Sequence, residues 1–311
     1  MESTRITKWI EEIAKDQDLR SRIMKKNEAF YILIVLAGSV LWGTTGTAQH
    51  FAPVGASPLS IGAVRLAVGG TALTILALSK GAVKGKEIWM NPNTYISAAS
   101  VAAYQLFFFA AVLKTGVAMG TVVAIGSAPV FAGLFSMVMG REKPDSKWIV
   151  ATLVSIIGCI LLITGGQELT ANVSGVLLAL AAGAAYAGYT AFSKQLLDKY
   201  STLAVTGVVF FIGAILLSPL LFVYDLSWLR SIQGIGVALH LGLLATAMAY
   251  VLFTYGLSGI PLHKAVTLSL TEPATASMLG VFLLKEQLSP ISWIGIALVF
   301  AGLIIVSLKR G

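Results

Sequence analysis

Long apolar stretches alternate with short polar or turn-rich segments along almost the whole chain. A bilayer core about 30 Å thick is crossed by about 20 apolar residues in a helix, and ten stretches approach or exceed this length. They cover residues 30–49, 57–79, 94–113, 116–139, 147–166, 173–193, 202–223, 235–256, 262–283 and 289–308. The pattern therefore predicts ten transmembrane helices, and the least distinct boundary is the one near Lys114, between the third and the fourth.

The chain also contains the same short passage twice, 144 residues apart. Ser127-Ala128-Pro129 is followed by Arg141-Glu142, and Thr271-Glu272-Pro273 is followed at the same distance by Lys285-Glu286. The same spacing relates Trp42 to Tyr186. Duplicated membrane units are typical of secondary transporters.

Each copy of this unit contains five predicted spans, and five is an odd number. The second copy must therefore cross the membrane in the sense opposite to the first, about an axis in the membrane plane. The prediction is an all-α integral membrane protein with ten transmembrane helices in two inverted five-helix repeats, at residues 30–166 and 173–308. In such proteins the substrate site lies near the midplane, between the repeats.

Composition supports a membrane protein and excludes a soluble enzyme. Hydrophobic residues make up 57% of the chain and charged residues 12%, whereas about a quarter of the residues in soluble domains are charged. The mean hydropathy is +0.85. The single cysteine, Cys159, and three scattered histidines predict no metal site, and no phosphate-binding loop is present. We expect no cofactor and no enzymatic activity.

The basic residues indicate an orientation in the membrane. The formal net charge is +8, but the basic residues lie between apolar segments and form no patch of the kind that binds nucleic acid. Of the 22 lysines and arginines, 18 fall in segments on the side of the two termini, 3 fall on the other side, and Arg65 lies within a span. By the positive-inside rule both termini are expected in the cytoplasm.

The first 29 residues form a charged leader before the first span. Ile6, Trp9, Ile10 and Ile13 share one helical face among lysines and glutamates. Two interpretations stay open: a cytoplasmic amphipathic helix lying on the inner leaflet, or a frayed tail.

Together these motifs resemble those of the drug/metabolite transporter superfamily, in particular its EamA-type ten-helix exporters. The resemblance is carried by the following residues: Ala37-x-x-x-x-Trp42-Gly43, Arg65, Ala128-Pro129 with Glu142, and Glu272-Pro273 with Lys285-Glu286. It covers residues 30–308 and implies export of amino acids, other small metabolites or drugs. The charged leader is not part of the family pattern.

Two charged residues lie well inside predicted spans, which is costly unless they face a partner or water. Arg65 is expected about 12 Å along the second helix, at 1.5 Å per residue, and Glu272 near the middle of the ninth. Glu272 could hold the ammonium group of a substrate, carry a proton that couples export, or pair structurally with Arg65 or a helix terminus. Arg65 could bind a substrate carboxylate or serve to lock helices and neutralise Glu272.

Two prolines occupy matching positions in the two repeats. Pro129 and Pro273 each interrupt a predicted helix, and paired interruptions in the two halves of a transporter point to its transport site. We expect a gating bend at both, although prolines are also common as simple kinks in membrane helices.

Aromatic and amide side chains at mid-span are further candidates for a substrate site. Trp42, Tyr104, Gln105, Tyr186 and Tyr250 are predicted to line a cavity, and Tyr189 and Tyr255 are considered with them; helix packing is the alternative role for each. The Phe107–Phe109 run is expected to face lipid or core.

The prediction is a secondary active transporter that exports a small metabolite by alternating access across a bacterial-type inner membrane, with an amino acid as the favoured substrate. Proton coupling and the oligomeric state stay open. The alternatives are an exporter of cationic or hydrophobic drugs, which Arg65 facing the cavity would disfavour, and a non-cycling channel.

Overall fold

The computed structural model describes residues 28–140, 143–165 and 172–308, and the predicted leader lies almost entirely outside this part of the chain. The described residues are helical and contain no strand, and ten of their helices are long and apolar enough to cross a membrane. The fold class predicted from the sequence is thus confirmed.

The ten spans differ in how regular they are. Five are single helices, namely the first helix (Glu28–His50), α2 (Pro58–Ser79), α5 (Ser146–Thr164), α6 (Val173–Leu196) and α13 (Pro290–Ser307). The third and fourth share α4 (Pro92–Val138), and the seventh combines α7 (Thr202–Leu217) with α8 (Leu220–Val223). The eighth joins α9 (Ile232–Leu239), the π-helix η2 (His240–Met248) and α10 (Ala249–Gly259). The ninth is divided into α11 (Leu262–Leu268) and α12 (Thr271–Leu284). Two short elements lie in connections, α3 (Glu87–Met90) and the 3-10 helix η1 (Ser227–Arg230).

The connection near Lys114 is made by a change of backbone direction inside α4. Gly116 has φ 81° and ψ 164°, which is not helical. A residue with a Cβ would be strained at this positive φ. The glycine therefore separates the third and fourth spans.

Short polar side chains set where several helices begin. An N-cap side-chain oxygen accepts a hydrogen bond from a backbone N–H of the first turn, which would otherwise have no partner. Four such caps form two pairs at the repeat spacing of 144 residues: Ser57 with Ser201, and Asp145 with Ser289. The duplication is thus visible at the level of individual helix caps.

Close contacts between helices follow an approximate two-fold axis. A Cβ added to Gly158 of α5 would meet Val299 of α13, and one added to Gly302 of α13 would meet Ser155 of α5. The 144-residue spacing pairs position 155 with 299 and position 158 with 302. Each of the two contacts joins one member of the first pair to one member of the second. Trp42 also contacts its own counterpart, Tyr186, with ring centroids 6.1 Å apart. Only a two-fold relation between the repeats brings equivalent residues together in this way.

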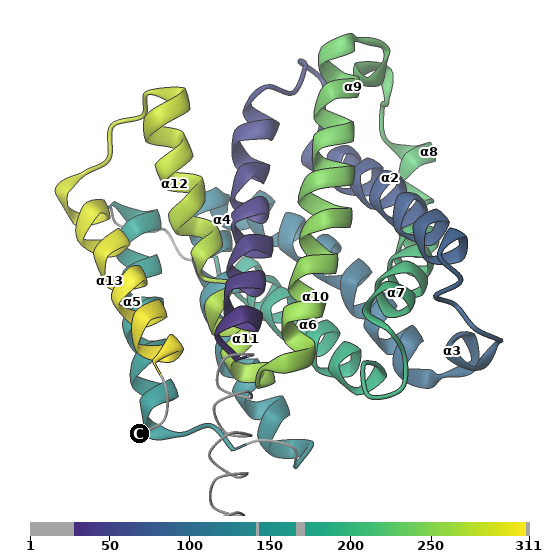
Figure 1. Ribbon diagram of the computed structural model, residues 1–311. Coiled ribbons are helices and arrows are strands. Elements are labelled where there is room, and N and C mark those ends of the chain that lie inside the picture. The colour runs from purple at the N-terminus through teal and green to yellow at the C-terminus, as the bar shows by residue number, and fades with distance from the viewer. Residues whose placement is uncertain (1–27, 141–142, 166–171, 309–311) are drawn as a thin grey trace, which may run out of the picture.

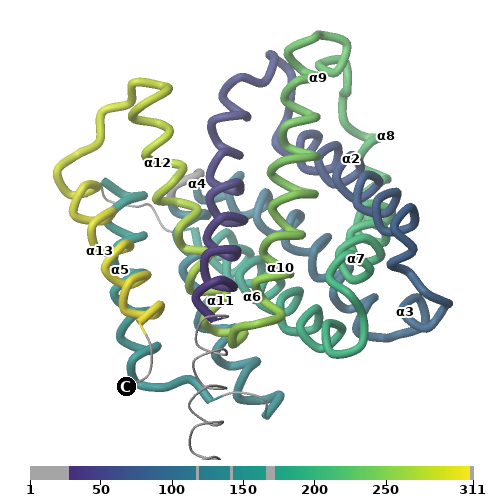
Figure 2. Tube along the Cα trace, viewed as in Figure 1, coloured from purple at the N-terminus to yellow at the C-terminus, as the bar shows by residue number. Residues whose placement is uncertain are grey.

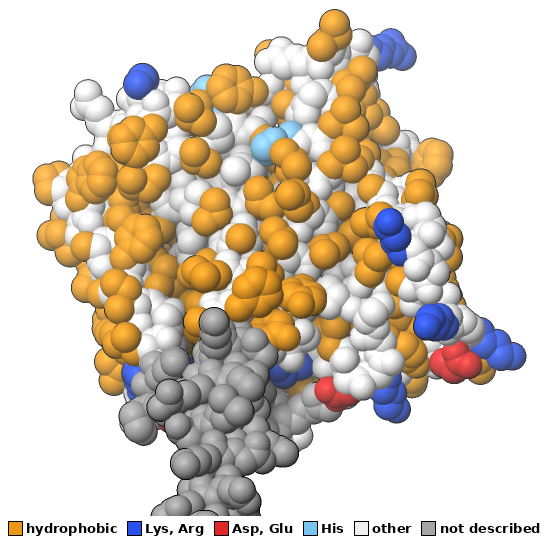
Figure 3. Space-filling view, in the orientation of Figure 1, with side chains coloured by type: hydrophobic (Ala, Val, Ile, Leu, Met, Phe, Trp, Pro, Cys, Tyr) orange, Lys and Arg blue, Asp and Glu red, His pale blue; other side chains and the backbone are white. Residues whose placement is uncertain are grey.

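The bundle has two ends, and the first helix begins at the same end at which α13 finishes (Figures 1 and 2). We call this end the terminal side and the other the distal side. Large apolar side chains cover the face seen in Figure 3, as expected for a surface in contact with lipid.

Candidate substrate-binding cavity

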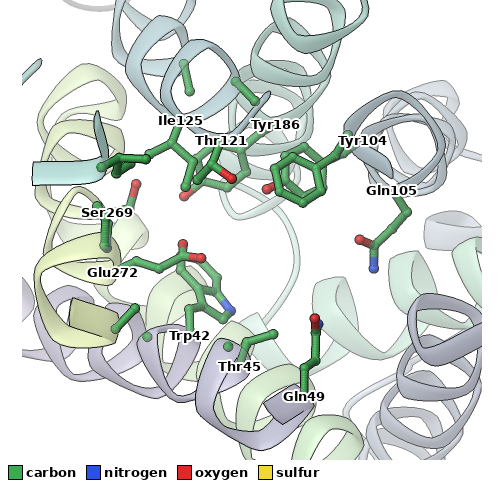
Figure 4. Close-up of a pocket in the computed structure, with 18 of the residues that line it drawn as sticks. Trp42, Thr45, Gln49, Tyr104, Gln105, Thr121, Ile125, Tyr186, Ser269 and Glu272 are labelled. Atoms are coloured by element: carbon green, nitrogen blue, oxygen red, sulfur yellow. The ribbon is translucent and has the colours of Figure 1, made fainter. Parts of the chain in front are cut away.

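A cavity of about 310 Å³ lies between the two repeats, bounded by the first helix, α2, α4, α5, α6, α10 and the broken ninth span. All seven residues predicted to bind substrate line it: Trp42, Arg65, Tyr104, Gln105, Tyr186, Tyr250 and Glu272. Figure 4 shows the side chains of Glu272, Gln49 and Gln105 directed toward a common space. Its volume is at the lower end of the range for small-molecule sites.

Glu272 reaches the cavity because the ninth span is interrupted just before it. The turn at Ser269 and Leu270 separates α11 from α12, and Glu272 lies in the first turn of α12. The Ser269 hydroxyl donates to the carbonyl of Val266 (2.7 Å), and the Thr271 hydroxyl donates to that of Leu268 (2.8 Å). These bonds satisfy carbonyls that the interruption exposes, and the helix N-terminus favours the negative charge of Glu272.

The two matching prolines differ in their surroundings. Pro273 lies in the first turn of α12, where the missing N–H costs no helical bond, and it lines the cavity. Pro129 lies inside α4, where the only residue with non-helical dihedral angles is Gly116, and it is not among the cavity residues. The two prolines for which gating bends are predicted therefore lie in different backbone settings: Pro273 follows the interruption of the ninth span, and Pro129 lies inside a continuous helix.

Arg65 and Glu272 line the same cavity without pairing. In the part of the chain that the structure describes, neither side chain makes an ion pair, and Arg65 Nε is buried with no hydrogen-bond partner. The structural pair that the sequence left open is not formed here. The two opposite charges are both available to a dipolar ligand.

Other polar atoms near the cavity also lack partners. Of the six described buried side-chain atoms without a hydrogen bond, four belong to residues that line this cavity or a space of about 10 Å³ beside it: Trp42 Nε1, Arg65 Nε, Tyr186 Oη and Thr246 Oγ1. Buried polar groups in native proteins are almost always satisfied. Such a concentration of unsatisfied polar groups is typical of a site at which a ligand or water supplies the missing hydrogen bonds.

The terminal-side wall of the cavity is aromatic. The centroid of the Trp42 ring lies 4.8 Å from that of Tyr250 and 5.0 Å from that of Phe253. The ring centroids of Tyr104 and Tyr186 are 6.0 Å apart. Rings at these distances pack favourably and hold one another in place. Trp42 is 5% exposed, so most of its ring is packed against these neighbours.

The other aromatic candidates have mixed positions. Phe107 is partly exposed at the surface, but Phe108 and Phe109 line the cavity, so the Phe107–Phe109 run does not simply face lipid or core. Tyr255 is 43% exposed and does not line the cavity. The hydroxyl of Tyr189 is paired with Thr254 at 3.0 Å, and its ring is buried beside the cavity.

Sequence reasoning missed several polar lining residues: Thr45, Gln49, Thr121, Ser269 and Ser277. A signal for two of them was present. Trp42, Thr45 and Gln49 are spaced by three and four residues, which places them on one face of the first helix. This polar stripe in an apolar helix marks the cavity side.

No resident metal centre is visible: within the described residues, no group of three or more His, Cys, Asp or Glu side chains comes together. The cavity presents two charges, amides and hydroxyls, and aromatic rings to a ligand.

Ten membrane-spanning helices in two inverted repeats, with a polar cavity between them, define a multi-pass membrane transporter. Comparison with known proteins gives the family. Residues 29–164 and 173–308 each match the EamA-like transporter family, and the chain belongs to it.

Individual relatives agree with this assignment. The chain is 46% identical over 284 residues to "Uncharacterized transporter YwfM" of Bacillus subtilis (strain 168), covering 91% of this chain and 95% of the relative. It is 27% identical over 274 residues to the threonine/homoserine exporter RhtA of Escherichia coli (strain K12), covering 87% and 88%. A solved crystal structure matches with a TM-score of 0.76 at 20% identity, over 88% of this chain and 95% of the other, which shows a shared fold.

Proposed function

We propose that this transporter is a secondary active exporter of small dipolar metabolites, with amino acids as the favoured class, in a bacterial-type inner membrane with both termini in the cytoplasm. The observation that carries the proposal is the presence of Arg65 and Glu272 in one cavity between the repeats, without an ion pair joining them. An amino acid carries one charge of each sign and complements both residues.

The two charges lie on different walls, which supports an oriented ligand. Arg65 also adjoins the small neighbouring space with Gln105 and Thr246, whereas Glu272 lies on the other side, next to Ser269. We propose that Arg65 and Gln105 hold the carboxylate of the substrate and that Glu272 holds its ammonium group. Charge-assisted hydrogen bonds of this kind are about twice as strong as neutral ones.

The size of the cavity and one named relative support the substrate class. A volume of about 310 Å³ suits a small metabolite better than a large drug. The relative RhtA is a threonine/homoserine exporter, and both of its named substrates are amino acids. Arg65 on the wall disfavours the alternative of a cationic drug, because the two positive charges would repel each other.

Closure on the terminal side supports an alternating cycle over a channel. The lining residues lie in the middle and distal parts of their helices, such as Gln49 and Ile163. Toward the terminal side, every residue of α11 is buried. A channel would need a continuous path through this region.

The test is to replace Glu272 by glutamine, which keeps its shape and removes its charge. Reconstituted vesicles are loaded with unlabelled amino acid, and uptake of labelled amino acid by counterflow is measured. Losing one charge-assisted bond of about 1.5–3 kcal/mol predicts a rise in KM of about 10-fold to 150-fold. Glu286→Gln is the matched control, because Glu286 is a carboxylate that does not line the cavity.

The outcomes separate the remaining roles of Glu272. An unchanged KM and rate at every pH would exclude both the ammonium-binding and the proton-carrying roles. A normal KM with lost coupling to a pH gradient would favour the proton role. Absence of counterflow in the wild-type protein, despite substrate flux, would favour a channel.

A further inference from the structure

The terminal half of the bundle contains a closed counterpart of the open cavity. The 144-residue spacing relates the cavity residues Thr45, Gly46 and Gln49 of the first helix to Tyr189, Thr190 and Ser193 of α6. The three α6 residues are 2%, 0% and 0% exposed. Equivalent faces of the two repeats are thus in opposite states, one open and one sealed.

The sealed face of α6 is polar, as the open face of the first helix is. The Tyr189 hydroxyl pairs with Thr254 Oγ1 at 3.0 Å, and the Ser193 hydroxyl lies 3.4 Å from Ser97 Oγ. A hydroxyl pair of this kind can exchange its protein partner for water or substrate when the helices separate. A purely apolar contact between these helices would expose apolar surface to water when the helices separate.

The ninth span completes the seal. All seven residues of α11 are buried, including His263 and Lys264. Lys264 lies near the start of the predicted ninth span, and in the structure its Nζ is 2.9 Å from Glu28 Oε1 of the first helix. This ion pair joins the start of the first repeat to the ninth span.

A second lysine holds the same region. Lys194 Nζ, on α6, donates to the backbone carbonyls of Leu257 and Ile260, at the turn that leads into α11. Cations near the last carbonyls of a helix are stabilising. Two lysines of the second repeat therefore hold this region in place: Lys264 ties α11 to the first helix, and Lys194 of α6 binds the turn that precedes α11.

Building on the proposed export function, we propose that Tyr189, Thr190 and Ser193 line the route by which substrate enters from the terminal side, and that the Lys264–Glu28 pair is the lock on this route. In the alternate state the repeats exchange roles: the α6 face opens, and the equivalent face of the first helix closes. Because the repeats are inverted, the state open to the distal side and the state open to the terminal side are related by the same approximate two-fold axis.

The proposal is tested with single cysteines at a repeat-related pair of positions, Gln49→Cys and Ser193→Cys, in a Cys159→Ala background. A small, charged, membrane-impermeant thiol reagent is applied to right-side-out and inside-out vesicles, with no substrate present. Lys264→Met is then added to each, and Lys264→Arg serves as the control that retains the cation.

In the parent protein, the thiol at 49 is expected to react from the distal side and the thiol at 193 to be protected. Loss of the Lys264 charge shifts the population toward the alternate state. The rate at 193 from the terminal side is expected to rise about tenfold, which corresponds to about 1.4 kcal/mol, while the rate at 49 falls. Lys264→Arg should resemble the parent.

Reciprocal change at the two sites supports the route whether or not amino acids are the substrate. A thiol at 193 that stays protected in Lys264→Met, while 49 keeps its reactivity, overturns the proposal. Simultaneous gain of reactivity at both sites also overturns it, because that result indicates a loosened fold and not an exchange of states. Failure of amino-acid counterflow with reciprocal labelling intact would reject only the proposed substrate.

Discussion

The packing of α5 against α13 gives a quantitative prediction about the glycines on the two-fold axis. In Gly158→Ala the new methyl group would lie 2.6 Å from Val299 N and 2.8 Å from Gly295 O. In Gly302→Ala it would lie 2.7 Å from Ala151 O. In Gly302→Ala the new methyl group would also meet the Ser155 side chain. The other neighbours named are backbone atoms, so the helices themselves must move apart to restore ordinary contact distances.

The expected cost follows from two opposing effects. Overpacking of this kind costs about 1–3 kcal/mol, and replacing glycine by alanine in a helix returns up to about 1 kcal/mol. With the full gain from helix propensity, a net loss of up to about 2 kcal/mol in the free energy of unfolding is therefore expected for each variant. Because the two sites are related by the repeat, their losses should be similar.

Gly46→Ala is the matched control. Gly46 is also in a helix, but an added Cβ would meet nothing within 4 Å. This variant should gain up to about 1 kcal/mol from helix propensity alone. The gain from helix propensity is common to the control and test variants, so the gap between them equals the overpacking cost of about 1–3 kcal/mol. This gap is about 2–6 °C in unfolding temperature at about 2 °C per kcal/mol.

The assay is thermal unfolding of the purified protein in detergent, followed by intrinsic fluorescence. Gly158→Val, with a larger side chain, should lower the unfolding temperature further. If Gly158→Ala proves as stable as Gly46→Ala, the two helices do not approach as closely as the structure shows, and the symmetric contact is refuted.

Two further predictions concern the cavity and the ion pair. Gly46→Leu should fill part of the cavity without a clash at its Cβ and should therefore slow counterflow of bulky amino acids more than that of small ones; equal slowing of all would contradict this. Lys264 has a side chain 11% exposed and Glu28 one 33% exposed, so Glu28→Gln, which strands the more buried charge, should lower the unfolding temperature more than Lys264→Met does. The reverse order would show that Glu28 is the less hydrated partner.

Much of the architecture was predictable because its causes are local in the chain. A span needs only about 20 apolar residues, and the odd number of spans per repeat already requires inversion. The charges of Arg65 and Glu272 stood out for the same reason, since a charge within an apolar stretch must face a partner or water. Seven predicted residues do line one cavity, and their roles in binding stay a prediction.

Other features depend on contacts that no local pattern encodes. Pro129 and Pro273 have the same motif, yet the ninth span breaks and the fourth continues through its proline. The π-helical turns of η2, which carry Thr246 to the space beside Arg65, gave no recognisable signal. Lys264 is one of the 18 basic residues on the side of the two termini, and only the structure shows its ion pair with Glu28.

By itself, the sequence determined ten spans, their inverted duplication and the two charges that lie well inside the spans. Only the tertiary structure decided which half of the bundle is open, that Arg65 and Glu272 share a cavity without pairing, and which lysines seal the other half. The physical reason is that hydropathy and charge are properties of single segments. Two repeats of nearly equivalent pattern permit either end to be closed, and packing between helices selects one.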